Sequence, residues 1–590
     1  MKKASLLFLA GMISCFAFSQ EQDSTKTKKT NFKKFTDNLS GNFESNAQWY
    51  LNDKKTGEFD EDEHVRANSY LRLDYSFLKN FTVGIQAESY APRPLLNYTE
   101  LFNKRVAFAQ FYANYRSEKL DITGGYFYEQ FGSGLVLRAW EDRALGINNS
   151  LRGGKIKYSP TNYLNFTALY GKQRKGFSVA NSDIFGGNAE FNAADIIKSD
   201  KLTDLTLGLS YVGKKEEYKT TNNDSNVPEN VNAYSARLDI SAGKFNIGGE
   251  YVHKSKDARL NKGSSPSFSE KRTFTGNAIL FTTGFSQKGL GINYTFRRLE
   301  NMRFFSERNF SNLGSNPTSQ LTLNYIPGLT KQHDYTLTNI YVYQAQPGMS
   351  FLPGETFPIA AGEIGNQVDI FYKIKKGTKL GGKYGTKISL NYSYWAMLDA
   401  KNIDPNANPF FPTDDFTYED EFLSFKKKLF TDFNIEIRKK WSRKLSSIFT
   451  YINTYYNQDI LESKGNGSEV RAWIGIAEST YKLGKGRSAR LELQHLSTND
   501  DARNWVGGTA EYFFNSKFGI YINDSFNYEE GKNPENYNIH LFNVGGSFTK
   551  GATRVALNYG RQRGGLLCVG GVCRPVSKNT GLTLNLTTSF

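Results

Sequence analysis

Two cysteines near the end of the chain stand in the stretch LLCVGGVCRPV, residues 566–576. A close cysteine pair suits three chemistries: metal ligation, thiol–disulfide exchange or a structural disulfide. A metal site needs about four N or S ligands, and no histidine or third cysteine is near. A redox motif has C-x-x-C spacing instead. Gly570 and Gly571 suit a two-residue hairpin turn, which sets Cys568 opposite Cys573 within disulfide reach. We therefore predict a small stapled hairpin.

The densest group of polar side chains lies in residues 124–153, GGYFYEQFGSGLVLRAWEDRALGINNSLRG. A Gly-x-Gly step at Gly132 and Gly134 predicts a kink, a bulge or a close backbone approach. Two interpretations stay open: a polar ligand site or gating loop, and a salt-bridged loop that satisfies itself and fills an interior. The second is favoured. The candidate cluster consists of Arg138, Glu141, Asp142, Arg143, Asn148 and Arg152.

Enzymatic chemistry finds little support. The five histidines, at positions 64, 253, 333, 495 and 540, are scattered, and none has H-E-x-x-H spacing. The chain has no G-x-S-x-G elbow, no P-loop and no zinc quartet. The acidic stretch 58–64 lacks the fixed ligand spacing of a calcium loop and is interpreted as solvated. We expect no enzyme, no catalytic residue, no metal and no cofactor.

The elements that must position these residues are strands. In TGLTLNLTTSF, residues 580–590, apolar and polar side chains alternate, and KISLNYSY, residues 387–394, repeats the pattern. A period of two places each set on one face of a sheet. The chain holds 35 Tyr and 45 Phe, and no apolar run of 18 residues follows its start, so a membrane-spanning helix is not expected.

The lengths of the connections between strands indicate which kind of β fold the chain adopts. Very short turns, such as 78–80, 117–119, 286–289 and 515–517, alternate with long polar loops, such as 92–105 and 399–417. Short periplasmic turns and long extracellular loops are typical of a transmembrane antiparallel up-and-down β-barrel. Both ends of the chain in the periplasm require an even strand number. Admitting weak strands at 187–197 and 320–328 gives about 26 strands, within a range of 22–28.

The chain divides into three parts. Residues 1–19 have the positive start, apolar stretch and small-x-small end of a signal peptide, and residues 20–41 form a polar periplasmic lead-in. The barrel is expected over residues 42–590. Cys15 leaves with the signal peptide unless it is an acylated lipoprotein residue, which the poor lipobox disfavours. An exported chain with one remaining cysteine pair supports the disulfide.

Basic residues suggest what the barrel contacts. The formal net charge is +16, and the predicted lumen positions Arg297, Lys387, Arg490 and Arg554 would favour anions. The favoured alternative spreads the charge over turns and loops near anionic headgroups. Two similar strand tips, YGKQRKG and YGRQRGG, place basic side chains for lipopolysaccharide phosphates, with coincidence an equal alternative. These side chains are Lys172, Arg174, Arg561 and Arg563. Nucleic acid is not expected as a partner.

The signal-peptide end FAFSQ, the 124–153 stretch, residues 375–387 and the cysteine-containing tail resemble a family of Bacteroidota outer-membrane proteins of unknown function. The resemblance spans the mature chain and implies an outer-membrane barrel without a known substrate. The terminal Phe590, which closes an alternating strand, resembles the signal read by the barrel insertion machinery. The lead-in is too short for a TonB box and plug, which counts against an energised receptor.

The sequence therefore predicts a barrel in the cell outer membrane, with lipid, lipopolysaccharide and the insertion machinery as partners. The leading function is a porin-like channel or transport pathway for small polar or anionic solutes. The alternative is a non-transport barrel subunit that docks beside other outer-membrane proteins in a secretion or assembly complex. A hydrophobic transporter is weaker, because the lead-in has no apolar plug helix.

Overall fold

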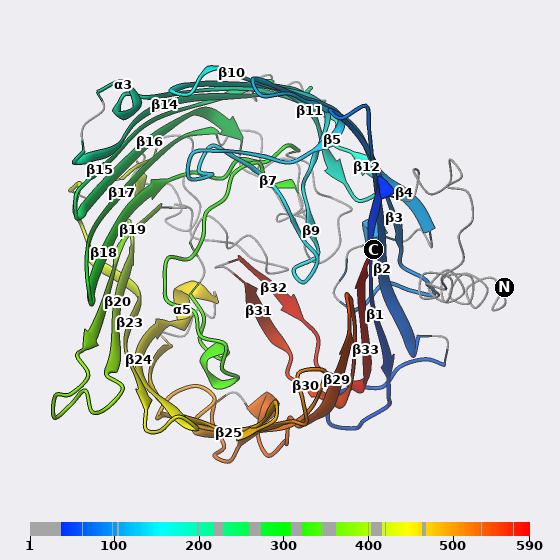
Figure 1. Cartoon of the computed structure of the whole chain (residues 1–590), viewed down its shortest axis with the longest axis vertical. Coiled ribbons are helices and arrows are strands. Elements are labelled where there is room, and N and C mark those ends of the chain that lie inside the picture. Colours follow the sequence, from blue (N-terminus) through cyan, green and yellow to red (C-terminus); the bar gives the residue numbers. More distant parts are fainter. Residues whose placement is uncertain are drawn as a thin grey trace, which may run out of the picture.

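The chain forms one closed ring of strands in the computed structural model (Figure 1). The structure describes residues 37–61, 63–96, 98, 100–102, 106–197, 200–217, 228–258, 273–307, 321–343, 345, 362–398, 400–402, 416–418, 421–462, 468–532, 534–569 and 572–590. The predicted signal peptide and most of the predicted lead-in lie outside these residues.

The continuous sheet has 25 strands, of which β12 (Ser178–Val179) is a short branch of β11, so 24 antiparallel strands make the barrel. The first twelve are β1 (Leu39–Tyr50), β2 (Val65–Phe77), β3 (Phe81–Ser89), β4 (Val106–Arg116), β5 (Leu120–Phe127), β10 (Leu151–Thr161), β11 (Leu164–Lys175), β13 (Asp183–Asn192), β14 (Leu202–Lys215), β15 (Asn230–Ala242), β16 (Phe245–Ala258) and β17 (Thr273–Gln287). The second twelve are β18 (Leu290–Glu300), β19 (Gly362–Ile374), β20 (Thr386–Met397), β23 (Lys427–Lys440), β24 (Leu445–Asn457), β25 (Glu469–Gly484), β26 (Arg487–Thr498), β27 (Trp505–Phe513), β28 (Phe518–Asn527), β29 (Asn543–Lys550), β30 (Thr553–Gln562) and β33 (Asn579–Ser589). The ring closes because β1 pairs with both β2 and β33.

Remaining elements lie in the connections between barrel strands. The small hairpins are β6 (Glu129–Phe131) with β7 (Leu137–Ala139), β8 (Glu141–Asp142) with β9 (Ile147–Asn148), β21 (Ala400–Asn402) with β22 (Phe416–Tyr418), and β31 (Gly565–Val569) with β32 (Val572–Val576). The short helices are η1 (Glu100–Phe102), α3 (Ala194–Ile197), η3 (Leu337–Asn339), α5 (Gln458–Leu461) and η5 (Pro534–Asn536).

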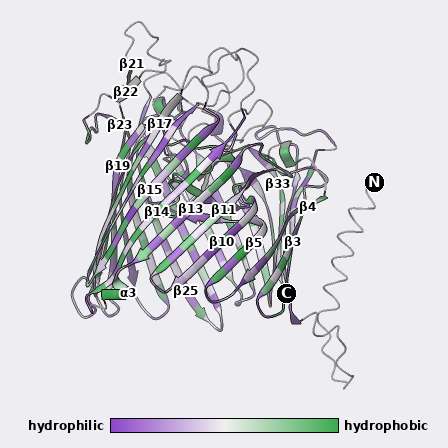
Figure 2. Cartoon of the chain, turned by 90° about the horizontal axis from the view of Figure 1, so that it is seen from above, coloured by the Kyte–Doolittle hydropathy of each residue, from purple (hydrophilic) through white to green (hydrophobic). Residues whose placement is uncertain are grey.

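Alternation along each strand sends apolar side chains outward and polar ones into the lumen. On β26, Leu491 and Leu493 are 52% and 56% exposed, whereas Glu492 and Gln494 are each 3% exposed. This arrangement is the reverse of a soluble protein, and it fits a wall that faces hydrocarbon. Figure 2 shows the alternating hydropathy along the strands.

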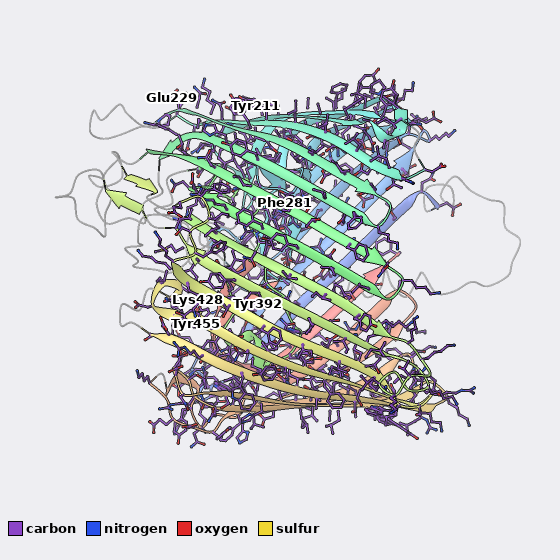
Figure 3. The ribbon with its side chains drawn as sticks, turned by 90° about the vertical axis from the view of Figure 1, so that its left-hand side faces the viewer. Tyr211, Glu229, Phe281, Tyr392, Lys428 and Tyr455 are labelled. Carbon is purple, nitrogen blue, oxygen red and sulfur yellow. The ribbon has the colours of Figure 1, made fainter. Side chains whose placement is uncertain are left out.

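Aromatic rings gather near the ends of the outer surface. Phe81 lies between Phe77 and Tyr115 beside a short turn, with ring centroids 5.6 and 4.8 Å away. Toward the other end, Tyr211 and Tyr234 pair at 5.2 Å. Figure 3 shows the side chains on this outer face. Two aromatic girdles around an apolar band are the signature of an outer-membrane barrel.

Turn lengths confirm the predicted polarity of the barrel. Short turns connect strand pairs such as β2–β3, β4–β5, β17–β18 and β27–β28, and they lie at one end together with α3 and the C-terminus (Figure 2). Longer connections, including residues 128–150 between β5 and β10, start and end at the other end. Long loops face the outside in such barrels, so we term this the outer end.

The strand count lies inside the predicted range, two below the predicted 26. The weak strand predicted at 187–197 exists as β13, displaced toward the N-terminus. The strand predicted at 320–328 is wrong: in the described residues this segment forms one isolated bridge, Phe305 to Thr322. The turn predicted at 329–334 is also wrong. Leu329 and His333 lie inside the ring of strands, as described below.

Candidate functional site

Two outer-end connections fold back into the ring of strands (Figure 1). The first inward loop is residues 128–150, between β5 and β10, and carries the small hairpins β6–β7 and β8–β9. The second inward loop consists of residues 301–307, 321–343 and 345, between β18 and β19. Together we term them the lumen plug.

Backbone hydrogen bonds join the two inward loops to each other. The amide of Arg138 donates to the carbonyl of Leu323 at 2.7 Å, and the amide of Tyr325 donates to Gly134 at 2.9 Å. The Asn149 side chain donates to the carbonyl of Thr322 at 2.9 Å. The loops therefore form one body rather than two independent flaps.

Glycine permits the close approach that the Gly-x-Gly step predicted. Gly132 has φ +52, and a Cβ there would lie 2.5 Å from the Arg237 side chain on the wall. The next amide, Ser133, donates to Glu250 at 3.0 Å. The tip of the first inward loop thus seats on β15 and β16.

Apolar side chains fill the space behind this tip. The tip contributes Phe131, Leu135, Val136 and Leu137, all almost fully buried, and they pack against Val212, Val252, Leu299 and Phe304 among others. Burial of such side chains contributes roughly 1.5–3 kcal/mol each. The first inward loop is therefore a packed part of the fold.

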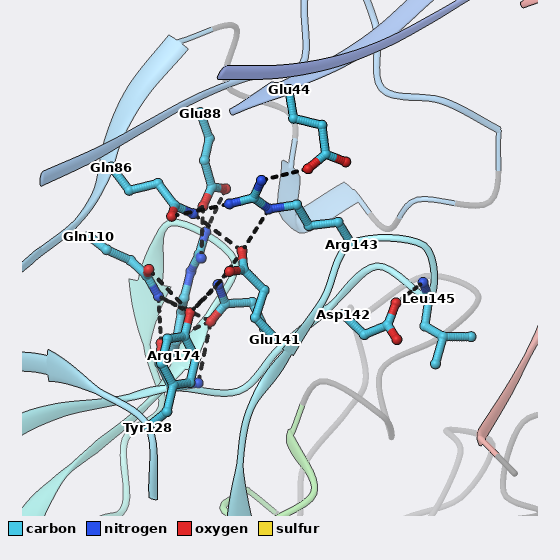
Figure 4. A network of polar contacts seen from close by, with 12 residues as sticks. Glu44, Gln86, Glu88, Gln110, Tyr128, Glu141, Asp142, Arg143, Leu145 and Arg174 are labelled. Carbon is cyan, nitrogen blue, oxygen red and sulfur yellow. Dashed lines mark hydrogen bonds and ion pairs between the residues drawn. The ribbon is translucent and has the colours of Figure 1, made fainter. Parts of the chain in front are cut away.

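The side of the wall that β1, β3, β4 and β11 form holds the plug through charged and amide groups, and we term it the polar sector (Figure 4). Glu88 of β3 and Arg174 of β11 form a bidentate ion pair at 2.9 and 2.7 Å, with both side chains 1% exposed. Gln86 and Tyr90 each donate to Glu88 at 2.9 Å. All carboxylate oxygens of Glu88 are thereby satisfied.

Arg143 attaches the first inward loop to the polar sector. Its guanidinium donates to Glu44 of β1 at 2.7 Å and to Glu141 at 3.3 Å, and it lies 4.4 Å from the ring centroid of Tyr70. Burial opposes its charge, but Glu141 and Glu44 hold the pKa of Arg143 above its usual value. The loop is clamped to the wall at neutral pH.

The other predicted cluster residues separate into several roles. Asn148 accepts from Gln110 at 3.1 Å and donates to Glu141 at 3.1 Å, so it belongs to the polar sector. Arg138 lies over Trp140 and Tyr325, and Asp142 accepts from the Leu145 amide at 2.9 Å. Arg152 is exposed on the outward face of β10 and does not join the cluster.

The opposite side of the wall holds the plug through apolar and aromatic groups, and we term it the aromatic sector. It comprises inward side chains of β20 and β23–β27, including Trp395, Phe430, Ile452, Ile474, Leu496 and Trp505. The second inward loop places Leu337, Tyr341 and Tyr343 against them. The Tyr343 ring stacks 5.7 Å from Trp395 and 5.1 Å from Phe430.

A few directed hydrogen bonds fix the register of this apolar contact. The indole of Trp395 donates to the carbonyl of Leu329 at 2.9 Å, and the amide of Leu337 donates to Gln494 at 2.9 Å. Tyr343 donates its hydroxyl to Glu363. The Nε2 atom of His333 is buried without a hydrogen-bond partner in the described residues.

The predicted lumen arginines are neutralised. Arg297 pairs with Glu363 at 2.7 Å, donates to the Pro327 carbonyl at 2.6 Å, and is 1% exposed. Arg490 contacts Glu478 at 2.9 Å, Glu511 at 3.2 Å, and Glu492. Acids therefore outnumber the base at this point of the lumen wall.

Lys387 and Arg554 face the lumen near the short-turn end, where they are exposed. No ion pair is found for either one within the described part of the chain. The predicted basic interior is thus confined to that end, and an anion preference of the whole lumen has no support from Arg297 or Arg490.

The four predicted strand-tip bases all have partners within the chain. Lys172 pairs with Asp183 at 3.2 Å, Arg174 with Glu88, Arg561 with Asp53 at 2.7 Å, and Arg563 donates to the Asn339 carbonyl at 2.6 Å. The four do not form a free phosphate site. Lys172 lies on the outer face, where its side chain is 36% exposed.

The cysteine hairpin has the predicted register. Cys568 lies opposite Cys573, and Val569 opposite Val572, in β31 and β32. The turn residues and the side chains of both cysteines lie outside the described part, so the disulfide stays a prediction. The hairpin lies inside the ring in the axial view (Figure 1), and β31 contacts η3 of the second inward loop.

Sequence reasoning missed the second inward loop and its seat. The signal was present in the aromatic spacing of Tyr335, Tyr341 and Tyr343, which lie between two strands with no short turn of their own. We interpreted the residues just before them, 320–334, as a strand and a turn. Isoleucines that face inward at 452 and 474 also break the polar-inside rule, and such breaks mark where the plug seats.

No metal centre is found in the described residues, where no group of three or more His, Cys, Asp and Glu side chains is arranged for a metal. None of the helices there is long and apolar enough to cross a membrane.

The closed wall, the apolar outer band and the polar lumen define an outer-membrane β-barrel, and the lumen plug is its candidate functional site. A family model of unknown function, DUF6029, matches residues 1–590, so the chain belongs to that family. No curated protein matches.

Solved structures with some likeness are large barrels. The siderophore receptor PirA from Pseudomonas aeruginosa has 9% identity and a TM-score of 0.39, over 94% of this chain and 80% of that one. The translocation pore of the P pilus usher PapC has 10% identity and a TM-score of 0.40, over 94% and 99%. The unliganded ferric citrate transporter FecA has 8% identity and a TM-score of 0.40, over 94% and 79%.

Proposed function

We propose that the protein is a gated outer-membrane passage for small polar solutes, and that the lumen plug is its gate. One observation carries the proposal: a wide barrel encloses two loops, and side chains of these loops contact inward side chains of the wall. A barrel of this size leaves a lumen that its own wall side chains do not fill. Water, a partner or the chain's own loops must occupy that space, and the plug lies there.

Polar lining supports a hydrophilic solute. Lumen positions of β27–β33 carry small polar groups, namely Thr509, Asn543, Asn558, Thr583 and Asn585. Such groups offer both donors and acceptors to a hydrated solute. The sequence suggested anionic solutes. The glutamates around Arg490 favour a passage without that preference, so we propose neutral polar solutes first.

Solute flux into liposomes tests the proposal. Glu300 and Gly362 are paired neighbours in the barrel, so a short Gly-Ser linker can replace residues 301–361 without stretching the wall. We expect slow sugar uptake with the full chain and fast uptake with this replacement. A matched control replaces residues 400–418 of the β20–β23 connection, which leaves the described plug contacts intact.

A non-transport subunit of a larger complex is the second candidate. The tight packing of the plug, through the Arg143–Glu44 pair and two apolar clusters, favours it, because such a closure suits a sealed barrel. Equal, slow uptake by both chains would contradict the gated passage and favour this alternative. Copurification of the full chain with other membrane proteins would then identify its role.

We also propose, from the sequence and the resemblance, that the protein is Bacteroidota in origin and that residues 1–19 direct its export. The insertion machinery would read the final strand, in which Phe590 exchanges backbone hydrogen bonds with Gly41 at the short-turn end.

A further inference from the structure

The outer face of β10–β16 contains a hollow of about 690 Å³. Small side chains make its floor: Ala168 of β11, Gly187 and Ala189 of β13, and Ala236 of β15. Tyr158, Phe166, Tyr211, Tyr234 and Tyr251 stand around it. The hollow lies on the surface that faces hydrocarbon, where the available occupant is an acyl chain.

Strand register aligns the floor in rows. Ile156, Ala168, Gly187 and Tyr211 are successive cross-strand neighbours. A Cβ at Gly187 would meet nothing closer than 3.9 Å, so the space above it is open. The hollow therefore results from residue size rather than from a break in the sheet.

A basic row lies above this floor, toward the outer end. The row consists of one residue from each of the same four strands, four positions nearer the outer end than the floor row of Ile156, Ala168, Gly187 and Tyr211. These residues are Arg152, Lys172, Asp183 and Lys215. Lys172 and Asp183 neutralise each other at 3.2 Å. Arg152 and Lys215 are exposed, and neither has an ion pair in the described part of the chain. Lys215 also lies opposite Asp183, so the row of three bases and one acid carries a net charge of +2.

The distance between the charged row and the apolar hollow matches that between the headgroup and the acyl chains of a lipid. Four strand residues span roughly 13 Å, which separates the charged row from the apolar hollow by about the distance between a headgroup and the upper part of its acyl chains. The row lies at the outer end, where the lipid leaflet faces the outside. Phosphate favours Lys and Arg through charge-assisted hydrogen bonds.

We propose that this face binds a bisphosphorylated glycolipid of the outer leaflet, with one phosphate on Arg152, the other on Lys215 and an acyl chain in the hollow. The site is separate from the lumen, so it does not depend on the proposed passage.

Native mass spectrometry of the full chain in detergent tests the site with two probes, bisphosphorylated lipid A and its dephosphorylated form. One variant removes the charge, Arg152→Gln with Lys215→Gln, and another fills the floor, Gly187→Leu with Ala168→Leu. The matched control is Lys428→Gln with Arg471→Gln, which removes two basic side chains from other strands.

We expect the phosphorylated probe to bind the full chain and the control equally. The affinity of the charge variant for this probe should be at least about 10-fold lower than that of the full chain, and the affinity of the filled variant should fall by a similar factor. Heat-modifiable migration on gels checks that each variant is folded. Equal binding of both probes to every chain would mean nonspecific annular lipid and overturn the proposal. A loss in only one of the two variants would also contradict it, since the site needs both parts.

Discussion

The polar and aromatic sectors hold the same plug by different physics. In the polar sector, Arg143 of the first inward loop pairs with Glu44 of the wall, and the buried Arg174–Glu88 pair braces the wall beside it. In the aromatic sector, Tyr343 and Leu337 are buried by shape and apolar area. Removing one partner of a buried ion pair costs far more than the pair contributes. Truncating an apolar contact costs in proportion to what is removed.

The difference indicates which side of the plug releases first. An ion-pair clamp is strong while complete and fails abruptly once a partner is lost. An apolar seat weakens gradually and tolerates partial release. We therefore expect the second inward loop, on the aromatic sector, to be the moving part, and the first inward loop to stay with the wall.

The largest expected effect follows from Glu88→Ala. It leaves Arg174 buried and uncompensated, so the free energy of unfolding should fall by about 3–5 kcal/mol. Urea titration of the barrel in lipid vesicles measures this fall. The control Asp183→Ala breaks the half-exposed pair with Lys172 and should cost no more than about 1 kcal/mol. Similar losses of stability in both variants would contradict the claim that the buried pair of the polar sector matters more than a partly exposed ion pair.

Leu337→Ala tests the aromatic sector. The side chain is 1% exposed, and its loss should weaken the seat of the second inward loop by about 2–5 kcal/mol while the barrel itself stays intact. Limited trypsin digestion at Lys331 in folded barrels should become much faster. Leu209→Ala, on the 64% exposed outer face, serves as the control. Unchanged cleavage would show that Leu337 does not hold the loop.

Acidification should loosen the aromatic sector through His333. Burial and the Lys331 ammonium lower the pKa of His333 to about 4, while Glu436 and Asp334 act in the opposite direction. Between pH 6.5 and 4 the released imidazole binds more protons than the seated one, so seating is favoured above this window and weakens as pH falls through it. Trypsin cleavage of the loop should therefore rise from pH 7 to pH 5. His333→Gln should remove most of that rise, and an unaltered rise would assign it to another group.

The smallest expected effect concerns the cysteine hairpin, which touches η3 of the second inward loop. A disulfide between Cys568 and Cys573 closes a very short loop and should contribute about 2 kcal/mol or less. Cys568→Ser with Cys573→Ser should speed loop cleavage slightly. Thiol titration of the unfolded protein gives the direct check: equal counts before and after reduction would exclude the bond.

The wall could be predicted from sequence because each strand obeys a local rule. Period-two alternation and turn length decide the face of Leu491 and Glu492 without knowledge of any other strand. The register of Cys568 and Cys573 also followed from a local turn rule.

The plug could not be predicted in this way, because its contacts join residues far apart in the chain. Arg143 meets Glu44, and the amide of Leu337 meets Gln494, across many intervening residues. The cluster at 124–153 was recognised by composition, and Glu141, Arg143 and Asn148 came together as predicted. Arg152 did not, since strand parity turns it outward, where it belongs to the proposed lipid site.

Single-barrel conductance in planar bilayers tests the central claim most directly. Phe127 and Leu151 are paired neighbours, as are Glu300 and Gly362, so short linkers can replace both inward loops in one chain. A plug that closes a polar passage predicts a low, intermittent conductance for the full chain and a large, steady conductance for the doubly replaced barrel. Equal conductance of the two folded barrels would contradict it.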